Sequence, residues 1–378
     1  MGFDPNIKIG VLGGGQLGRM MIQSGIDFNL NIGVLDPDPN APCKNLVGNF
    51  QVGSLTDFDT VYQFGQQFDL ITIEIENVNT EALKKLQEEG KKVYPQPEVI
   101  EIIKDKGVQK EFYKNNSIPT SEYFLLENKE QLKEHIDFLP AVHKLRTEGY
   151  DGRGVKVLKS KENISEGFDA SAVLEKYVDY TKEISVLVAR NANGETKTYP
   201  AVELEFHPEA NLVEFLFSPA SIDTETEIKA SKIAIEVIEK LDMIGLLAVE
   251  MFLTKDGDIL VNESAPRTHN SGHHTIEANV TSQFEQHLRA ILNLPLGDTS
   301  IISNAVMINL LGAEGHTGNA KYEGAEIVMS LDEVHLHLYG KKTTKPFRKM
   351  GHATILGKEM EKVKSKAKLV KSTLIIKA

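Results

Sequence analysis

Two glutamates that a β-hairpin would bring face to face are the residues of this sequence best suited to chemistry. The segments around Glu250 and Glu263 have the pattern of two strands joined at Asp256-Gly257, the pair preferred for a two-residue turn. With that turn, Lys255 pairs with Asp258, facing residue numbers sum to 513, and Glu250 faces Glu263. A divalent cation would relieve the repulsion between two carboxylates on one partly buried face. Oxygen ligands alone favour magnesium, and the alternative is a slipped register that turns one Glu to solvent.

A glycine-rich basic loop at residues 149–154 is a candidate for phosphate binding. It contains three glycines and Arg153, and Lys144 and Arg146 precede it. Backbone amides and cations on a flexible loop suit a polyphosphate. An exposed hairpin turn at Asp151-Gly152 is the structural alternative.

Another glycine motif lies near the N-terminus, between an expected strand and an expected helix. Gly13, Gly15 and Gly18 fit the pattern G-x-G-x-x-G, and Asp36 ends the next strand 18 residues later. This spacing is typical of a dinucleotide site and therefore of an oxidoreductase. Since bare amides at a helix N-terminus bind any phosphate, a mononucleotide or sugar-phosphate site and a plain tight turn also stay open.

Two acidic residues, Glu74 and Glu76, lie near the carboxyl end of a predicted strand. They share a face with Thr72, at the end of the strand where open α/β sheets form ligand crevices. Because helices normally cover both faces of such a sheet, carboxylates in this position indicate a bound ligand. A solvated strand end is the alternative.

A polar run at residues 262–274 follows the expected hairpin directly. In this run Arg267, Asn270 and Ser271 suit the recognition of an anion and of hydroxyl groups. Its three histidines have no carboxylate or thiolate at zinc-ligand spacing, which disfavours a zinc site.

A basic run at residues 341–349 concentrates five cations in a chain that is acidic overall. One interpretation is a solvated basic loop. The other is that the run folds back over the first glycine loop and holds a phosphate from the other side.

The elements that must position these residues divide the chain into three expected domains, at residues 1–100, 101–295 and 296–378. A chain of 378 residues exceeds the size of one core. Strands alternate with helices in the first domain, which predicts a doubly wound parallel sheet. The second is expected to be strand-rich, and the third to be small and β-rich. The expected strands lie at 7–12, 31–35, 70–75, 305–310, 333–339 and 352–356, and the expected helices at 16–25, 58–68, 99–115, 225–241 and 282–292.

Composition excludes several classes of protein. The net charge of -12 argues against a duplex nucleic-acid binder, and no segment approaches the roughly 20 apolar residues of a membrane span. The lone Cys43 has no partner for a disulfide or a thiolate metal site. The first residues lack the order of a signal peptide, so we expect a cytoplasmic protein.

Taken in order, these motifs resemble the ATP-grasp superfamily, and within it the 5-(carboxyamino)imidazole ribonucleotide synthases of purine biosynthesis. The likeness covers nearly the whole chain and rests on residues 13–20, Lys144 with 149–154, 175–178, 262–263 and 265–273. It implies a mixed α/β and α+β architecture: an ATP-grasp fold with an N-terminal doubly wound parallel-sheet domain and a small β-rich C-terminal domain. It also implies a homodimer.

The resemblance assigns binding roles to individual residues. Those implied for ATP are Lys106, Lys144, Gly149, Tyr150, Asp151, Gly152, Arg153, Gly154, Glu175, Lys176, Tyr177, Val178, Glu183, Asn262 and Glu263. Those implied for aminoimidazole ribonucleotide are Gly15, Gln16, Leu17, Glu76, Tyr150, Asp151, Arg267, His269, Asn270, Ser271, Lys341, Arg348 and Lys349. Glu250 and Glu263 would ligate two magnesium ions, with manganese as a substitute.

The implied reaction is an ATP-dependent carboxylation with Lys144, Asp151 and Arg267 as catalytic residues. Bicarbonate attacks the γ-phosphate of ATP, carboxyphosphate forms, and its carbon passes to the exocyclic amine of the ribonucleotide while the loop excludes water. Asp151 is the candidate for the amine proton. Alternatives are another ATP-grasp ligase, a dinucleotide-dependent oxidoreductase and a nucleotide-binding regulator without turnover.

Four positions depart from the expected family pattern. Val155 replaces a common Gln, Glu148 a common Gly, and Lys106 a common Arg, which keeps the charge but loses the planar fork. Asn262 points away from Glu263 in an ideal strand, so its expected role requires a β-bulge.

Overall fold

The computed structural model describes residues 3–147, 154–207 and 212–378, and its N-terminal part is built on a five-stranded parallel sheet. The strand order is β3-β2-β1-β4-β5 with parallel neighbours, as the alternating pattern predicts. The elements are β1 (Lys8–Leu12), α1 (Gln16–Asp27), β2 (Asn31–Asp36), β3 (Asn49–Val52), α2 (Phe58–Gly65), β4 (Leu70–Ile73), α3 (Thr80–Glu88), β5 (Lys92–Val93) and α4 (Pro97–Lys104).

Strand β4 is shorter than predicted and ends at Ile73. Glu74 and Glu76 therefore belong to the bend that follows the strand rather than to the strand itself. They still lie at the carboxyl edge of the parallel sheet, where ligand crevices form.

The helix predicted over 99–115 is wrong as a single element, because two helices meet at Asp105. This residue has extended backbone angles, and α5 (Lys106–Asn115) begins directly after it. The Asp105 carboxylate accepts from the amides of Gly107 and Val108. It also pairs with Arg146 through Nε at 2.9 Å and Nη2 at 2.8 Å. The aspartate thus caps a new helix, and Lys106 becomes its first residue.

A small four-stranded antiparallel sheet forms one lobe, with the order β6-β9-β7-β8. Its elements are β6 (Tyr123–Leu126), the 3-10 helix η1 (Lys129–Phe138), β7 (Ala141–Leu145), β8 (Val155–Leu158), the 3-10 helix η2 (Lys161–Glu166) and β9 (Ala172–Lys176).

A nine-stranded antiparallel sheet forms the centre of the molecule. Eight strands follow the order β15-β14-β10-β12-β13-β16-β21-β19, and β11 pairs with β10 beside this path. Helix α6 (Thr224–Lys240) buries Ala230, Ala234 and Val237 against β10 and β14. The strands are β10 (Tyr180–Arg190), β11 (Thr196–Thr198), β12 (Val202–Phe206), β13 (Val213–Ser218), β14 (Gly245–Thr254), β15 (Ile259–Ala265), β16 (Asn304–Leu311), β19 (Val334–Leu338) and β21 (Lys349–Gly357).

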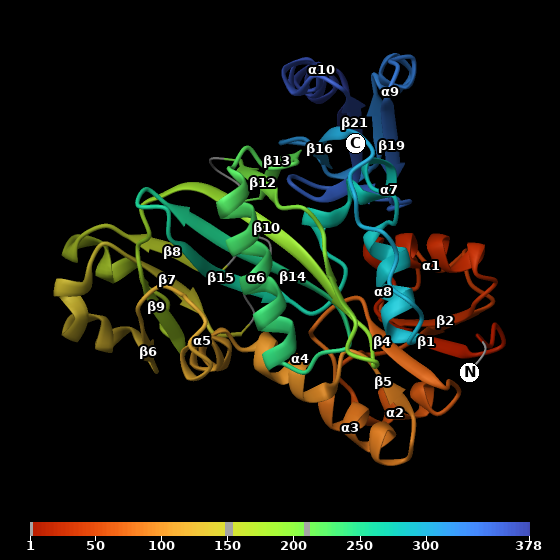
Figure 1. Cartoon of the computed structure of the whole chain (residues 1–378), viewed down its shortest axis with the longest axis horizontal. Coiled ribbons are helices and arrows are strands. Elements are labelled where there is room, and N and C mark those ends of the chain that lie inside the picture. Colours follow the sequence, from red (N-terminus) through yellow and green to blue (C-terminus); the bar gives the residue numbers. More distant parts are fainter. Residues whose placement is uncertain (1–2, 148–153, 208–211) are drawn as a thin grey trace.

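This large sheet continues into the C-terminal part of the chain, because β13 pairs with β16. The C-terminal part is β-rich as predicted, and Figure 1 shows it above the rest of the molecule. It also contains α10, a helix that our sequence analysis does not predict. Its further elements are β17 (Gly318–Asn319), β18 (Lys321–Glu323), α9 (Ala325–Met329), β20 (Thr343–Thr344), α10 (Met360–Thr373) and β22 (Ile375–Lys377). The domain limits near residues 100 and 295 stay predictions.

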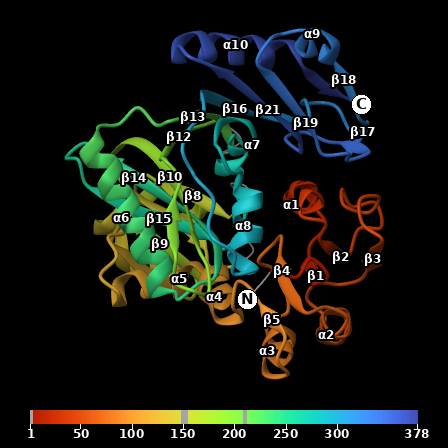
Figure 2. The same ribbon diagram turned by 45° about the vertical axis from the view of Figure 1, so that its right-hand side comes forward.

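Helix α8 (Gln283–Ile291) lies between the N-terminal part and the central sheet, as Figures 1 and 2 show. Its Phe284 and Leu288 pack in one core with Met20 and Met21 of α1. The segment before α8 contains η3 (Asn270–Gly272) and α7 (Thr275–Ala278). In the described ranges, every helix is too short or too polar to span a bilayer.

Candidate active site

The β14–β15 hairpin brings Glu250 and Glu263 face to face, as predicted, but through a different turn. Thr254 N donates to Asp258 O at 2.9 Å, so the loop has the three residues 255–257 and Lys255 does not face Asp258. Gly257 closes this loop with a φ of +84°, a conformation that glycine adopts without strain.

A β-bulge at Asn262 restores the predicted pairing. Near the turn, Met251 faces Val261, so the numbers of facing residues sum to 512. Beyond the bulge, Glu250 faces Glu263, and the sum is the predicted 513. Asn262 is the extra residue, and its Oδ1 accepts from Lys144 Nζ at 2.7 Å. The bulge that the resemblance requires at this position is therefore present, and it compensates for the longer turn.

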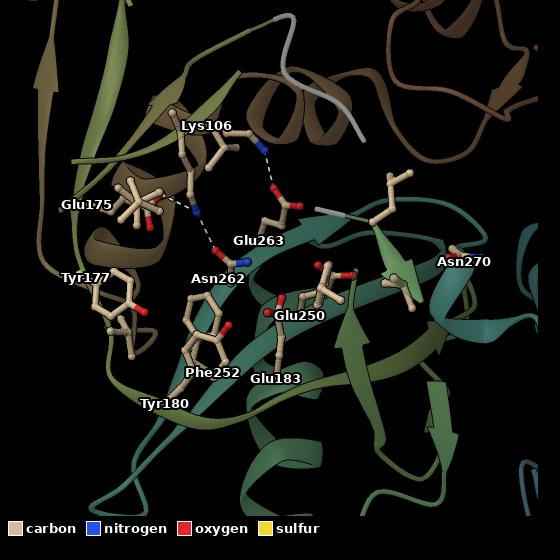
Figure 3. Close-up of a pocket in the computed structure, with 18 of the residues that line it drawn as sticks. Lys106, Glu175, Tyr177, Tyr180, Glu183, Glu250, Phe252, Asn262, Glu263 and Asn270 are labelled. Carbon is tan, nitrogen blue, oxygen red and sulfur yellow. Dashed lines mark hydrogen bonds and ion pairs between the residues drawn. The ribbon is translucent and has the colours of Figure 1, made fainter. Parts of the chain in front are cut away.

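A cavity of about 360 Å³ lies between the small sheet and the large sheet. Its wall includes apolar side chains, among them the stacked rings of Tyr180 and Phe252, whose centroids are 4.7 Å apart (Figure 3). The predicted site residues that line it are Lys106, Lys144, Glu175, Lys176, Tyr177, Val178, Glu183, Glu250, Asn262, Glu263, His269, Asn270 and Lys349. One cavity thus joins residues that the resemblance assigns to ATP, to metal and to the ribonucleotide.

On the small lobe, Glu175 is buried between two lysines. Its carboxylate lies 2.9 Å from Lys110 Nζ and 3.1 Å from Lys144 Nζ, and it accepts from Ser121 Oγ at 3.0 Å. Burial alone would raise the pKa of Glu175, but Lys144 and Lys110 lower it to about 2. Burial lowers the pKa of Lys110 to about 8 although Glu175 opposes this. The Glu175 carboxylate is therefore fully compensated by protein groups.

On the large sheet, Glu183 and Glu250 lack this compensation. Burial, followed by the charges of Glu263 and Glu183, raises the pKa of Glu250 well above its ordinary value. Burial and Glu263 raise the pKa of Glu183 to about 7. Glu263 differs, because Lys106 contacts it and lowers its pKa to about 2 against the effect of burial.

The facing carboxylates of Glu250 and Glu263 fit a magnesium ion. Glu250 and Glu263 face each other from paired strands, and their oxygens are the donor type that magnesium prefers. The part of the chain that the structure describes holds no cluster of three or more His, Cys, Asp or Glu suited to a metal. Two carboxylates suffice for magnesium when phosphate and water complete its shell.

At the first glycine loop, carboxylates accept hydrogen bonds from two of the backbone amides. Asp36 accepts from Gly14 N at 2.6 Å, and Glu74 accepts from Leu17 N at 3.1 Å. Burial raises the pKa of Glu74 to about 7. Since Asp36 is engaged by the loop itself, it does not have the free carboxylate that a dinucleotide ribose requires.

Two further predicted groups lie beside this loop. Glu76 forms an ion pair with Arg267, whose Nε lies 2.9 Å from Glu76 Oε1, and this pair joins the N-terminal part to the polar run after β15. The basic run returns to the N-terminal part, where Lys342 Nζ donates to Asn40 Oδ1 at 3.0 Å. Within the run, Lys341 Nζ donates to the carbonyl of Lys349 at 2.7 Å. The basic loop therefore folds back toward the glycine loop.

Comparisons with known proteins match this arrangement. Three family models match in succession: the ribonucleotide synthetase preATP-grasp domain at 6–104, the ATP-grasp domain at 111–284, and the phosphoribosylaminoimidazole carboxylase C-terminal domain at 305–366. The N5-carboxyaminoimidazole ribonucleotide synthase of Bacillus subtilis is 36% identical over 359 residues, which cover 93% of this chain and 92% of that protein. The chain belongs to this synthase family.

Solved structures of N5-carboxyaminoimidazole ribonucleotide synthases share the fold over almost the full length. The Thermotoga maritima enzyme has 41% identity and a TM-score of 0.90, covering 98% of this chain and 99% of that one. The Aspergillus clavatus enzyme, in complex with ADP and 5-aminoimidazole ribonucleotide, has 32% identity, a TM-score of 0.90 and 98% coverage of both chains. The chain spans about two thirds of the length of the plant and yeast phosphoribosylaminoimidazole carboxylases that it matches at 38% identity.

Some residues assigned by the synthase resemblance lie outside the described residues: Gly149, Tyr150, Asp151, Gly152 and Arg153, together with the departure at Glu148. Gly154 at the end of this loop has a φ of +74°, and its carbonyl accepts from Leu145 N at 2.8 Å. Val155 begins β8 and lines the cavity.

The histidines of the polar run divide into two environments. His269 lines the cavity, and its Nδ1 lies 2.9 Å from Ser271 Oγ and 3.7 Å from a Glu250 oxygen. His273 and His274 are buried, and burial lowers the pKa of both. Of these three histidines, His269 alone therefore lines the cavity.

Lys110, which completes the ion pairs around Glu175, was not among the predicted site residues. A signal was available, because Lys110 follows Lys106 by four residues and so shares its helix face. The stacked pair of Tyr180 and Phe252 was not predicted either. Strand alternation gives no signal for it, since Tyr180 precedes a bulge in the pairing of β10 with β14.

Proposed function

We propose that the chain carboxylates 5-aminoimidazole ribonucleotide with bicarbonate and ATP, through carboxyphosphate, to yield N5-carboxyaminoimidazole ribonucleotide, ADP and phosphate. The observation that carries this proposal is the single cavity that joins the Lys106 and Lys144 pair, the Glu250 and Glu263 pair, and the His269-Asn270 segment. The membership of the synthase family supports it, as does the structure of a relative with ADP and the ribonucleotide.

The nucleotide phosphates are bound at the cationic side of the cavity. Lys106 and Lys144 now contact Glu263 and Asn262, and the phosphates take over these contacts when ATP binds. The backbone of residues 175–178 borders the same cavity and is suited to the adenine ring. Pre-positioned cations offset the charge that develops on the transferred phosphoryl group.

Glu250 and Glu263 hold magnesium in this proposal. The metal supplies positive charge that stabilises the phosphates, and it removes the repulsion that raises the pKa of Glu250. Manganese can substitute for magnesium, because it accepts the same oxygen ligands.

The ribonucleotide is bound between the N-terminal part and the polar run. Its phosphate lies between the basic run and the amides of Gly15 to Leu17, where it takes over the Leu17 amide from the Glu74 carboxylate. Glu76 with Arg267 borders its ring. Asn270 is held in place by two hydrogen bonds with Asn309, at 3.0 and 2.8 Å. Asp151 accepts the amine proton. The cytoplasmic location and the homodimer stay predictions.

The experiment that tests this function is phosphate release with and without the ribonucleotide, in buffers with and without bicarbonate. Turnover is expected to require bicarbonate, and labelled bicarbonate is expected in the product. Glu263→Gln should abolish bicarbonate-dependent ATP hydrolysis, because one of two metal ligands is lost. Glu326→Gln, an exposed change on α9, is the control. Undiminished turnover of Glu263→Gln would contradict the metal assignment.

A further inference from the structure

The buried side-chain amide of Gln283 forms two hydrogen bonds with the backbone of His269. Gln283 is the first residue of α8 and has no exposed surface. Its Oε1 accepts from His269 N at 2.8 Å, and its Nε2 donates to His269 O at 2.7 Å. Two hydrogen bonds to one residue act as a neighbouring strand would, so they fix both the position and the direction of the His269 backbone.

The surroundings leave this amide no freedom to move. A Cβ added to Gly272 would lie 2.4 Å from Gln283 Oε1, so the amide lies directly against the η3 backbone. Gln283 Nε2 also lies 3.3 Å from His273 Nδ1. The backbone amide of Gln283 donates to Thr275 Oγ1 at 2.8 Å, and that hydroxyl donates to Gly272 O at 2.6 Å.

The helix that carries Gln283 is fixed to both sides of the proposed substrate site. Phe284 and Leu288 pack into the core of the N-terminal part. His287 contacts Thr72 Oγ1 of β4 at 2.9 Å, and its Nδ1 accepts from Leu246 N of β14 at 3.3 Å. Helix α8 therefore fixes the position of His269 relative to both the parallel sheet and the β14–β15 hairpin.

We infer that Gln283 is a positioning residue, which places His269 for the ribonucleotide and acts only through it. The inference rests on the proposed function, because that function gives His269 its substrate. Gln283 itself does not line the cavity. Its contribution is the orientation of a group that does, and a small displacement of such a group is enough to lower activity.

The same helix provides a matched control. Gln286 is equally buried, and its side-chain amide holds the backbone of Gly297 in the same way. Gly297 N donates to Gln286 Oε1 at 2.7 Å, and Gln286 Nε2 donates to Gly297 O at 3.1 Å. Neither Gln286 nor Gly297 lines the cavity. Substitution of Gln286 therefore removes similar side-chain to backbone hydrogen bonds without displacing a residue of the site.

The test compares Gln283→Met with Gln286→Met in the full chain. Both changes should lower the melting temperature, because Gln286→Met removes two buried hydrogen bonds and Gln283→Met removes two to His269 and one to His273. Only Gln283→Met should raise the KM for the ribonucleotide, by about 10- to 100-fold, while the KM for ATP stays within about twofold. Gln283→Glu keeps the acceptor for the His269 amide but can donate to His269 O only when its carboxyl is protonated, so its KM for the ribonucleotide should fall toward the wild-type value as the pH is lowered. Equal KM values in the two Met variants would overturn the inference.

A double-mutant cycle tests whether Gln283 acts through His269. In a His269→Ala background, Gln283→Met should change the kcat/KM for the ribonucleotide by less than about twofold, because the group that it positions is absent. Additive effects would overturn the inference.

The proposed function can fail separately. If the wild-type chain shows no turnover that depends on the ribonucleotide, that function is wrong. The positioning role is then decided by the His269 imidazole signals in NMR spectra. Gln283→Met should shift them and Gln286→Met should not, and unchanged signals in both variants would overturn the role.

Discussion

Glu175 and Glu250 lie on the two sheets that enclose one cavity, and the protein treats their charges in opposite ways. Glu175 has two lysines within 3.1 Å, and its pKa falls to about 2. Glu250 faces another carboxylate, and burial with that charge raises its pKa. A charge balanced by the protein stabilises the fold, whereas an unbalanced one indicates a cation that binds with the substrate. The comparison therefore distinguishes Glu175, whose charge the protein balances, from Glu250, whose charge it leaves unbalanced in the same cavity.

The largest expected effect is on Glu175→Gln, which leaves Lys110 and Lys144 without their shared partner. Removing one side of a buried ion pair should lower the free energy of unfolding by about 3–5 kcal/mol. Denaturant unfolding of the unliganded protein measures it. Glu122→Gln, an exposed change next to β6, is the control and should stay within about 0.5 kcal/mol of wild type. A small loss for Glu175→Gln would show that the pair is not structural.

Acid should remove the same stabilisation in the wild-type chain. The pKa of Glu175 is about 2 when folded and 4.5 ordinarily, so its contribution is complete above pH 4.5 and is lost as the pH falls toward 2. The difference in unfolding free energy between wild type and Glu175→Gln should therefore shrink by about 3 kcal/mol over this window. Parallel acid titrations of both proteins measure it, and a difference that does not change with pH would contradict the pairing.

Lys110→Met should have a smaller effect than Glu175→Gln. Glu175 keeps Lys144 and Ser121 as partners, so the loss in unfolding free energy should be about 2 kcal/mol. The double variant of Lys110→Met and Glu175→Gln should be less destabilised than the sum of the single variants. Additive losses in the same unfolding experiment would show that the two groups are independent.

The smallest expected effect has the opposite sign. Glu250→Gln removes a carboxylate that faces Glu263, so the unliganded protein should gain about 1 kcal/mol of stability while turnover is lost. Magnesium with ADP should raise the melting temperature of the wild type and have little effect on this variant. Thermal unfolding with and without the ligands measures both. A loss of stability similar to that of Glu175→Gln would contradict the distinction between a balanced Glu175 and an unbalanced Glu250.

Much of the site could be predicted from local patterns. The alternation of strands and helices predicts the parallel sheet, and the hairpin pattern predicts that Glu250 faces Glu263. The second prediction is correct although its turn is wrong, since the bulge at Asn262 compensates for one extra loop residue. Strand pairing is robust here because the two segments are adjacent in sequence and alternate in hydrophobicity.

Other features depend on contacts between distant segments. The break at Asp105 depends on a side-chain cap that a helical periodicity does not reveal. In the large sheet, β13 (Val213–Ser218) pairs with β16 (Asn304–Leu311), which lies far away in the sequence. No local pattern predicts this pairing. Roles within the loop 149–153 stay predictions.

Local patterns in the chain specify the chemical types present: a facing pair of acids, cations near glycines, and a polar run after a hairpin. Which of these charges are balanced depends on contacts between elements that are distant in the sequence. Lys110, Lys144 and Glu175 come from three separate elements, and Gln283 reaches His269 from the start of another helix. Periodicity specifies which face of an element is buried, but the partner that meets that face is selected by packing across the whole chain.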